Sequence, residues 1–293
     1  MAVIESAHHM NARKSLKKIF RKISPFLYVN GQEFLKKHLT RKLLIRKPVY
    51  KALWSQYSGA MTVDRFNWFT YYDEKLNFLF HRIPKVANSS LTASLSKLAD
   101  SNYDFINSDM SQQEKRNVKT RTLHASEISN EEILNLTKIF KFAFVRNPYA
   151  RFLSAYLSKV EDRDISISNE FNIKHKEFLE TFSRDKSFEN FARLLAADET
   201  LLYSKVDFIP QVDFLLLKPE EYDFIGRFEN INNDFTYVAN KILSNSLTYE
   251  ILKEDPAHQT SADKKLKQYY TSYTKGLVKD LYKKDFEMLG YEY

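Results

Sequence analysis

Two short apolar, aromatic-rich runs, each followed by a helical pattern, constrain the fold most strongly. The runs are LNFLFHRI at residues 76–83 and IFKFAFV at residues 139–145. Their length and lack of polar alternation are typical of strands buried on both faces of a parallel sheet. Helical spacing of side chains follows over residues 91–98 and 152–159. Because strands that alternate with helices form βα units, we expect an α/β fold whose central, mainly parallel sheet is flanked by helices.

The length and the charge of the chain suggest how it is organised. Its 293 residues are many for one domain and few for two. We therefore assign residues 1–75 to a basic N-terminal arm with lead-in helices, and residues 76–293 to the α/β domain. Thirteen Lys or Arg and a single acid lie between residues 11 and 51, whereas the rest of the chain is nearly neutral. The net charge of +8 is thus a property of the arm, and it favours an anionic partner.

The arm also carries an amphipathic pattern. Its apolar residues recur at helical spacing, at Leu16, Ile19, Phe20 and Ile23. Such a helix can lay one face on acidic lipid headgroups, so peripheral contact with an acidic membrane is one interpretation. A solvated basic tail is the other. No recognised nucleic-acid-binding module accompanies the charge, and we expect no nucleic acid as a partner.

The stretch RIPKVANSSL at residues 82–91 joins the first strand to its helix. A strand end, a turn and a helix start present backbone N–H groups to one point, which suits a phosphate. Lys85 adds a charge, and Ser89 and Ser90 add hydroxyls. The Walker pattern GxxxxGK[ST] is absent, since Lys85 precedes the turn and the loop has no glycine. Asn88 stands where the turn needs a positive φ. A phosphate site and an ordinary βα turn both fit this loop.

The second stretch, FAFVRNPYARFLSAY at residues 142–156, favours the phosphate site. Arg146 ends the strand, Asn147 is placed as the N-cap of the helix, and Pro148 follows at its first position. Ser154 lies on that helix. An Arg at a strand end suits bidentate contact with an oxyanion. In a parallel sheet both stretches reach the carboxyl edge, where open α/β sheets bind ligands. The pair predicts a nucleotide with two separated phosphate groups.

RIPKVANSSL resembles the 5′-phosphosulfate loop of sulfotransferases that use 3′-phosphoadenosine-5′-phosphosulfate (PAPS), and FAFVRNPYARFLSAY resembles their 3′-phosphate segment. The pair is similar to the carbohydrate sulfotransferase branch that includes heparan sulfate 2-O-sulfotransferases and HNK-1 type enzymes. FIPQVDFL, YDFIGRFENINNDF and LVKDLYKKDFEMLGY match later segments of that branch. The resemblance covers about residues 77–293. It implies a P-loop-like three-layer fold and a sulfotransferase domain over residues 76–293.

The resemblance also implies roles for individual residues. The loop residues that would hold the 5′-phosphate and sulfate are Pro84, Lys85, Val86, Ala87, Asn88, Ser89 and Ser90. Lys85 would also act in catalysis, by stabilising charge on the oxygen that bridges sulfur and phosphorus. Arg146 and Ser154 would bind the 3′-phosphate. Asn88 departs from the family, whose members carry a small residue such as Gly or Cys there. PAPS is the implied sulfuryl donor, and no metal is expected.

A general base is needed for the acceptor hydroxyl. His124, in RTLHASEISNEEIL, precedes a helix whose Ser129 and Glu132 fit a capping box. HASEI resembles a segment of related enzymes that places a histidine near the acceptor. An imidazole suits base catalysis, although a lone His before a helix is often only a packing residue. His81, which we expect to be packed on its strand, and Glu161 are the alternatives.

Further expectations concern the surroundings of the site, the acceptor and the cellular location of the protein. The polar residues 160–187 suit a mobile cap over the site, and we expect Arg227 and Glu229 to form an internal ion pair. The resemblance implies a carbohydrate or glycolipid acceptor. The alternatives are an ATP-dependent kinase with a degenerate phosphate loop and a non-catalytic protein that binds membranes or polyanions.

The cellular location is predicted from two absences. The chain has zero cysteines, and it shows no visible anchor of the kind that lumenal animal relatives usually carry. We therefore expect a bacterial-type cytoplasmic enzyme, with the arm placing it on the inner membrane leaflet.

Overall fold

The computed structural model of the chain describes residues 42–59, 61–98, 122–129, 131–161, 176–251 and 261–292. The amphipathic pattern of the basic arm lies outside the described residues. So does much of the predicted cap. Membrane contact by the arm therefore stays a prediction.

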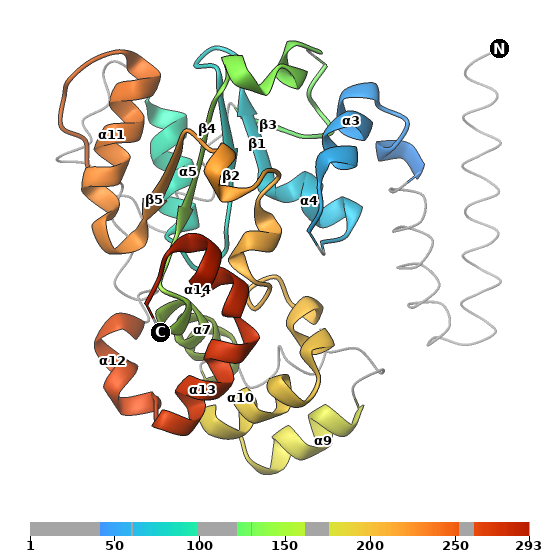
Figure 1. The fold of residues 1–293 in the computed structure, drawn as a ribbon, viewed down its shortest axis with the longest axis vertical. Helices are drawn as coiled ribbons and strands as arrows, with labels where there is room; N and C mark the ends of the chain where they lie inside the picture. Colours follow the sequence, from blue (N-terminus) through green and yellow to red (C-terminus); the bar gives the residue numbers. More distant parts are fainter. Residues whose placement is uncertain are drawn as a thin grey trace, which may run out of the picture.

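Five strands form one sheet in the order β3-β1-β2-β4-β5 (Figure 1). The strands are β1 (Thr70–Asp73), β2 (Phe78–His81), β3 (Leu123–His124), β4 (Phe140–Val145) and β5 (Phe224–Arg227). The central strands β2, β4 and β5 run parallel. Strand β1 runs antiparallel to both of its neighbours, β2 and β3. The prediction of a central, mainly parallel sheet is confirmed.

A tight turn joins β1 to β2. The buried Asp73 side chain accepts hydrogen bonds from the backbone N–H groups of Lys75 and Leu76, each at 3.0 Å, as in an Asx turn. Asn77 follows with a φ of 49°, a conformation that Asn tolerates well. Strand β1 therefore belongs to the sheet although it lies N-terminal to residue 76, and the domain boundary there stays a prediction.

Helices surround the sheet. The α-helices are α3 (Pro48–Gln56), α4 (Val63–Phe69), α5 (Asn88–Lys97), α7 (Pro148–Tyr156), α9 (Lys176–Arg184), α10 (Phe188–Ala197), α11 (Ile231–Leu243), α12 (Ala262–Tyr269), α13 (Ser272–Leu281) and α14 (Lys283–Leu289). The π-helical turn η3 (Leu157–Glu161) extends α7. Short 3₁₀ turns are η1 (Glu131–Leu134), η2 (Leu136–Lys138), η5 (Glu199–Ser204), η6 (Gln211–Phe214), η7 (Pro219–Glu221) and η8 (Phe228–Asn230).

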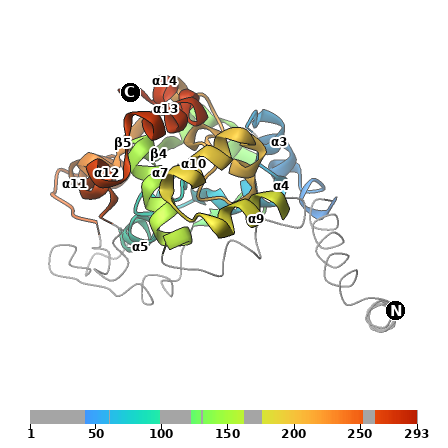
Figure 2. The ribbon, with the colours of Figure 1, turned by 90° about the horizontal axis from the view of Figure 1, so that it is seen from below.

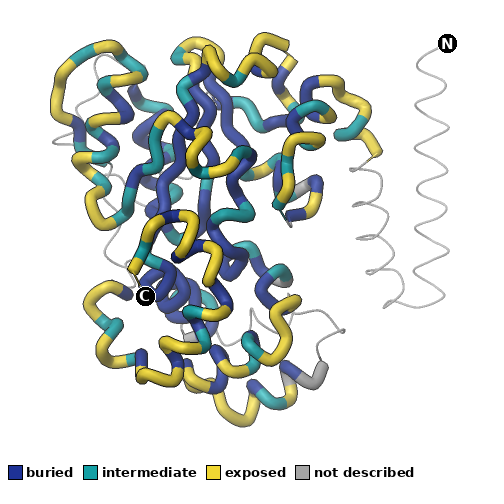
Figure 3. The backbone as a smooth tube through the Cα atoms, viewed as in Figure 1, coloured by how far each residue is buried: buried dark blue, intermediate teal, exposed yellow. Residues whose placement is uncertain are grey.

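The two faces of the sheet are covered by different helices. Phe78 and Phe80 pack with apolar side chains of α5 and α11, whereas Leu79 between them packs with α3 and α4. Successive side chains of a strand point to opposite faces, so the sheet lies between two helical layers, and Figure 2 shows α3 and α4 on one side and α5 and α11 on the other. The strands form the buried centre of the molecule (Figure 3). The predicted flanked-sheet architecture is confirmed.

A third core lies beyond the carboxyl ends of the parallel strands, where α7, α10, α12 and α13 gather (Figure 1). Helix α9 packs there as well, with Phe178 and Phe182 buried against Phe191 of α10. Residues 176–184 were predicted to be part of a polar cap. They form instead an amphipathic helix, because their apolar residues recur every four positions.

Candidate functional site

The carboxyl ends of β2 and β4 are adjacent. These strands pair in parallel, with His81 opposite Ala143, so the chain leaves both at the same edge of the sheet. The loop of residues 82–87 follows β2, and Arg146 follows β4. The Arg146 Nη1 donates a hydrogen bond to the Lys85 carbonyl oxygen at 3.2 Å. The two stretches singled out by sequence thus form one site.

The loop after β2 has an unusual backbone. Lys85 has a φ of 70°, and Ala87, the N-cap of α5, has a φ of 57°. The prediction that Asn88 takes the positive φ is wrong, because Asn88 is already the first helical residue. A left-handed non-glycine residue costs about 1–2 kcal/mol, and such strain concentrates at functional sites. Alternating left-handed residues also turn successive N–H groups toward one point, which suits an anion.

The other loop residues differ in what they offer a ligand. Pro84 has no N–H to donate to a ligand. The Pro84 and Val86 side chains are buried, and Val86 belongs to the core. Ser90 is fully buried and Ser89 is half-buried at the start of α5. The Asn88 Oδ1 is buried without a hydrogen-bond partner among the described residues. The loop therefore presents chiefly its backbone, Lys85 and the first turn of α5.

The Lys85 side chain reaches the helix that follows β4. Its Nζ donates a hydrogen bond to Ser158 Oγ at 2.6 Å. Ser158 lies in η3, the widened turn that continues α7, and such turns are frequent at functional sites. Ser154, which the sequence singled out, is buried four residues earlier. Sequence reasoning missed Ser158, although a spacing of four places it on the same helix face as Ser154.

Arg146 is almost completely buried. The nitrogen atoms and the plane of its guanidinium group each have a different environment. Besides Lys85, its Nη2 forms an ion pair with the Asp263 carboxylate of α12. Its plane lies over the Phe228 ring, with the guanidinium carbon 4.0 Å from the ring centroid. The Nε is buried and has no partner among the described residues. The guanidinium group is thus held in place, and its Nη2 donates to a carboxylate oxygen of Asp263.

A glutamine far along the chain fixes the backbone of Arg146. The Gln211 Oε1 accepts from the Arg146 N–H at 2.9 Å, and the Gln211 Nε2 donates to the Arg146 carbonyl oxygen at 2.9 Å. The backbone N–H groups of Gln211 and Val212 donate to the buried Asp285 carboxylate of α14, at 2.8 and 3.0 Å. Burial raises the pKa of Asp285 to about 6, although Arg151 and these hydrogen bonds oppose the shift. The C-terminal helix therefore supports the site.

Helix α7 ties the loop to the second stretch. The buried Arg151 Nε donates to the Pro84 carbonyl oxygen at 3.0 Å. Asn147 caps the helix as predicted, its side chain accepting from the N–H groups of Tyr149 and Ala150. Its own N–H donates to the Glu229 side chain at 2.6 Å. The α7 start is thus held by a carboxylate as well as by its cap.

The expected ion pair between Arg227 and Glu229 is not how these residues are used. The Arg227 Nη2 donates to the Leu289 carbonyl oxygen at 2.9 Å, and its guanidinium lies over the Tyr291 ring. Glu229 bonds the N–H of Asn147 and the Tyr291 hydroxyl. Arg227 therefore fixes the C-terminus, and Glu229 supports the start of α7.

His124 lies on the edge strand β3, on the far side of β1 from β2. Its ring packs edge-to-face against Trp68 and Tyr71, with centroid separations of 4.7 and 4.8 Å. Burial lowers the pKa of His124, and the charge of Arg82 adds to this, while Glu127 opposes it. The predicted α-helix after it is wrong: residues 131–134 form only the 3₁₀ turn η1.

Residues 68–292 match the sulfotransferase family, and this match covers most of the chain. The chain belongs to the sulfotransferase family. A curated relative, carbohydrate sulfotransferase 14 of Danio rerio, is 28% identical over 178 residues, which are 58% of this chain and 47% of the relative. The chain thus matches about half the length of that relative. No solved structure matches it.

The predicted bacterial-type cytoplasmic location is wrong. The matched relative is an animal carbohydrate sulfotransferase. We expected the lumenal animal relatives to be the members that carry a membrane anchor. In the described part of this sulfotransferase, every helix falls short of the length and apolarity needed to span a bilayer.

The two alternative bases in this sulfotransferase differ from His124. His81 is fully buried on β2, its Nδ1 lies 2.7 Å from the Tyr222 hydroxyl, and burial lowers its pKa to about 3. The Tyr222 hydroxyl in turn accepts from the Leu216 N–H. His81 is therefore a packed residue. Glu161 ends η3, but its side chain is outside the described part of the structure.

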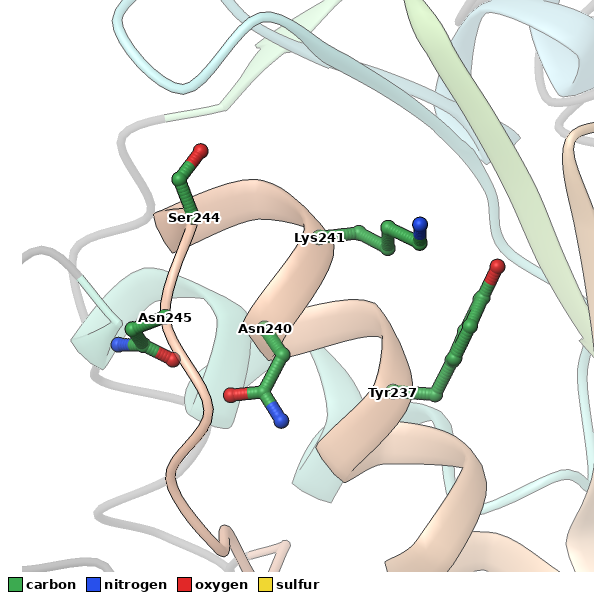
Figure 4. Close-up of a pocket in the computed structure, with 5 residues that line it drawn as sticks. All are labelled: Tyr237, Asn240, Lys241, Ser244 and Asn245. Carbon is green, nitrogen blue, oxygen red and sulfur yellow. The ribbon is translucent and has the colours of Figure 1, made fainter.

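A polar hollow lies at the end of α11 (Figure 4). Its lining residues are Tyr237, Asn240, Lys241, Ser244 and Asn245. They lie in the C-terminal half of α11 and just beyond its end. This 13-residue helix begins shortly after β5, and a helix of that length is about 20 Å long. The hollow is thus remote from the carboxyl edge of the sheet, and none of the predicted site residues lines it.

Proposed function

We propose that this sulfotransferase transfers the sulfuryl group of PAPS to a hydroxyl of a carbohydrate acceptor. The hydrogen bond between the Arg146 guanidinium and the Lys85 carbonyl oxygen carries the proposal, because it supports the expectation that the two predicted phosphate-binding stretches act together. Family membership supports the sulfotransfer. The name of the Danio rerio relative supports a carbohydrate as the acceptor. A glycolipid acceptor stays a prediction.

The residues of the site fit a donor with phosphate groups at both ends. The left-handed turn at Lys85 and Ala87 and the first turn of α5 suit the 5′-phosphate side. Arg146 suits the 3′-phosphate, since its Nη2 already binds a carboxylate, which presents oxyanions as a phosphate does. When bound, PAPS would supply the sulfuryl group.

Sulfuryl transfer requires positioning and charge stabilisation more than covalent help. The Lys85 ammonium, now bonded to Ser158, would stabilise negative charge on the departing oxygen. His124 would take the proton of the acceptor hydroxyl. A lowered pKa keeps its imidazole neutral near pH 7, and only a neutral imidazole can accept a proton.

Binding of the donor product tests the proposal. Isothermal titration and thermal unfolding with adenosine 3′,5′-bisphosphate, ADP and AMP compare a ligand that has a 3′-phosphate with two that lack it. We expect the bisphosphate to bind most tightly and to raise the melting temperature most. Lys85→Ala should weaken this binding only in part, because Arg146 and the backbone N–H groups of the loop remain, but it should lose sulfotransfer. Stabilisation by ADP equal to that by the bisphosphate, or a group-transfer activity that requires Mg²⁺ and ATP, would favour the kinase alternative and refute the proposal.

A further inference from the structure

Trp68 is exposed beside the site. The residue is 60% exposed, although tryptophan is usually well buried. The other tryptophan, Trp54, is half-buried and packs against Tyr57 and Phe66. Phe69, which follows Trp68, accepts the Arg82 N–H at 2.9 Å through its carbonyl oxygen. Since Arg82 begins the Lys85 loop, the backbone that carries Trp68 reaches the start of that loop one residue after the indole.

A chain of contacts connects the indole to the predicted base. The His124 ring packs between those of Trp68 and Tyr71. The Tyr71 hydroxyl accepts from Arg82 Nη1 at 2.8 Å. The Ser126 N–H also donates to the Asn67 side chain at 2.7 Å, which holds the two backbones together. The indole therefore contacts the His124 ring, and Tyr71, on which that ring also packs, connects the group to Arg82 of the loop.

We infer that Trp68 is a stacking platform for a sugar ring of the acceptor, and that it presents a hydroxyl of this ring to His124. The inference rests on the proposed function and names the acceptor subsite of the same site. A sugar ring has an apolar C–H face and hydroxyls at its edge. It suits an exposed aromatic face that has polar groups beside it.

The surroundings of Trp68 favour a sugar over an apolar protein partner. Asn67 precedes it in the sequence and the His124 ring packs against it, and both residues are polar. Large exposed apolar patches mark protein–protein interaction sites, and the fully buried centre of such an interface is depleted of charged residues. A single indole bordered by hydrogen-bonding groups matches a sugar ring, with its apolar face and its hydroxyl edge, better than it matches an apolar protein surface.

Fluorescence tests the inference without sulfotransfer. The chain has two tryptophans, so Trp54→Phe leaves Trp68 as the single indole reporter. This variant would be titrated with a panel of unsulfated hexasaccharides, both neutral and uronate-containing, in the presence of adenosine 3′,5′-bisphosphate. We expect at least one saccharide to cause a saturable blue shift of the emission. A shift that depends on protein concentration alone would indicate self-association and overturn the inference.

Kinetics provide the second readout. Trp68→Ala should raise the acceptor KM roughly tenfold and leave the dissociation constant of the bisphosphate unchanged, and Trp68→Phe should restore part of the loss. Tyr273→Ala, which removes another exposed ring on α13, is the matched control and should change neither. An unchanged KM in Trp68→Ala, or no response to any saccharide while the bisphosphate binds, overturns the inference. If the bisphosphate itself does not bind, the proposed function fails first.

Discussion

Asp263→Asn should increase the affinity of the protein for adenosine 3′,5′-bisphosphate. In the structure the Asp263 carboxylate forms an ion pair with Arg146 Nη2, and the two side chains are 45% and 6% exposed. If Arg146 binds the 3′-phosphate, then the phosphate must replace this carboxylate or share the guanidinium with it. The substitution removes the charge of the competitor but keeps its size.

The magnitude follows from the exposure of the two partners. Ion pairs in water contribute up to about 1 kcal/mol, whereas hydrogen bonds to buried charged groups contribute about 1.5–3 kcal/mol. This pair is intermediate, since only its arginine is buried. Release of about 1–2 kcal/mol corresponds to an increase in affinity of roughly 5- to 30-fold.

Isothermal titration at constant ionic strength measures the effect. Asp280→Asn, which neutralises an exposed acid on α13, controls for the general loss of one negative charge and should change the affinity less than about twofold. A weaker or unchanged affinity in Asp263→Asn would refute the reasoning. It would mean that the carboxylate orients Arg146 for the ligand and does not compete with it.

Three other predictions concern the residues that support the site. Gln211→Ala leaves the backbone N–H and carbonyl of Arg146 without their partners, so it should lower the free energy of unfolding by about 1–3 kcal/mol and weaken bisphosphate binding, as measured by urea denaturation and titration. Ala87→Gly should stabilise the protein by about 1 kcal/mol, because Ala87 has a φ of 57°, whereas Ala93→Gly inside α5 should destabilise it by about 1 kcal/mol; equal effects would contradict the strain at Ala87. The pKa of Asp285 is raised from 3.8 to about 6 in the folded protein, so the native state binds more protons and its stability should fall by roughly 3 kcal/mol between about pH 4 and pH 6. Asp285→Asn should abolish that part of the pH dependence in urea titrations, and an unaltered slope would show that Asp285 ionises normally.

Local sequence signals were sufficient to predict the two strand-turn-helix units. The apolar runs at β2 and β4 allow few alternatives, and Asn147 followed by Pro148 is a strong helix start that the structure bears out. These signals depend on neighbours in sequence, so they can be read without knowledge of tertiary contacts. The flanked sheet follows from the alternation of strands and helices for the same reason.

The contacts that complete the site could not be predicted in this way. The partners of the Arg146 backbone, of the Gln211 backbone and of the Arg146 guanidinium lie 65, 74 and 117 residues away along the chain. Gln211 and Asp285 occur in segments that matched the family, but nothing in their own neighbourhoods indicates a buried carboxylate that supports a glutamine. Such pairings depend on how the C-terminal helices pack.

The error at Asn88 shows how tertiary contacts decided the shape of the loop. Conformational preference alone ranks Asn above Ala and Lys for a positive φ, yet Lys85 and Ala87 take it. Two buried arginines hold the carbonyl groups on either side of the strained Lys85: Arg151 donates to the Pro84 oxygen at 3.0 Å, and Arg146 donates to the Lys85 oxygen at 3.2 Å. Hydrogen bonds from buried charged groups are strong enough to offset strain of this size. Both arginines belong to the second stretch, so these hydrogen bonds couple the two predicted phosphate-binding stretches, and a ligand that moves Arg146 should also move the backbone of Lys85.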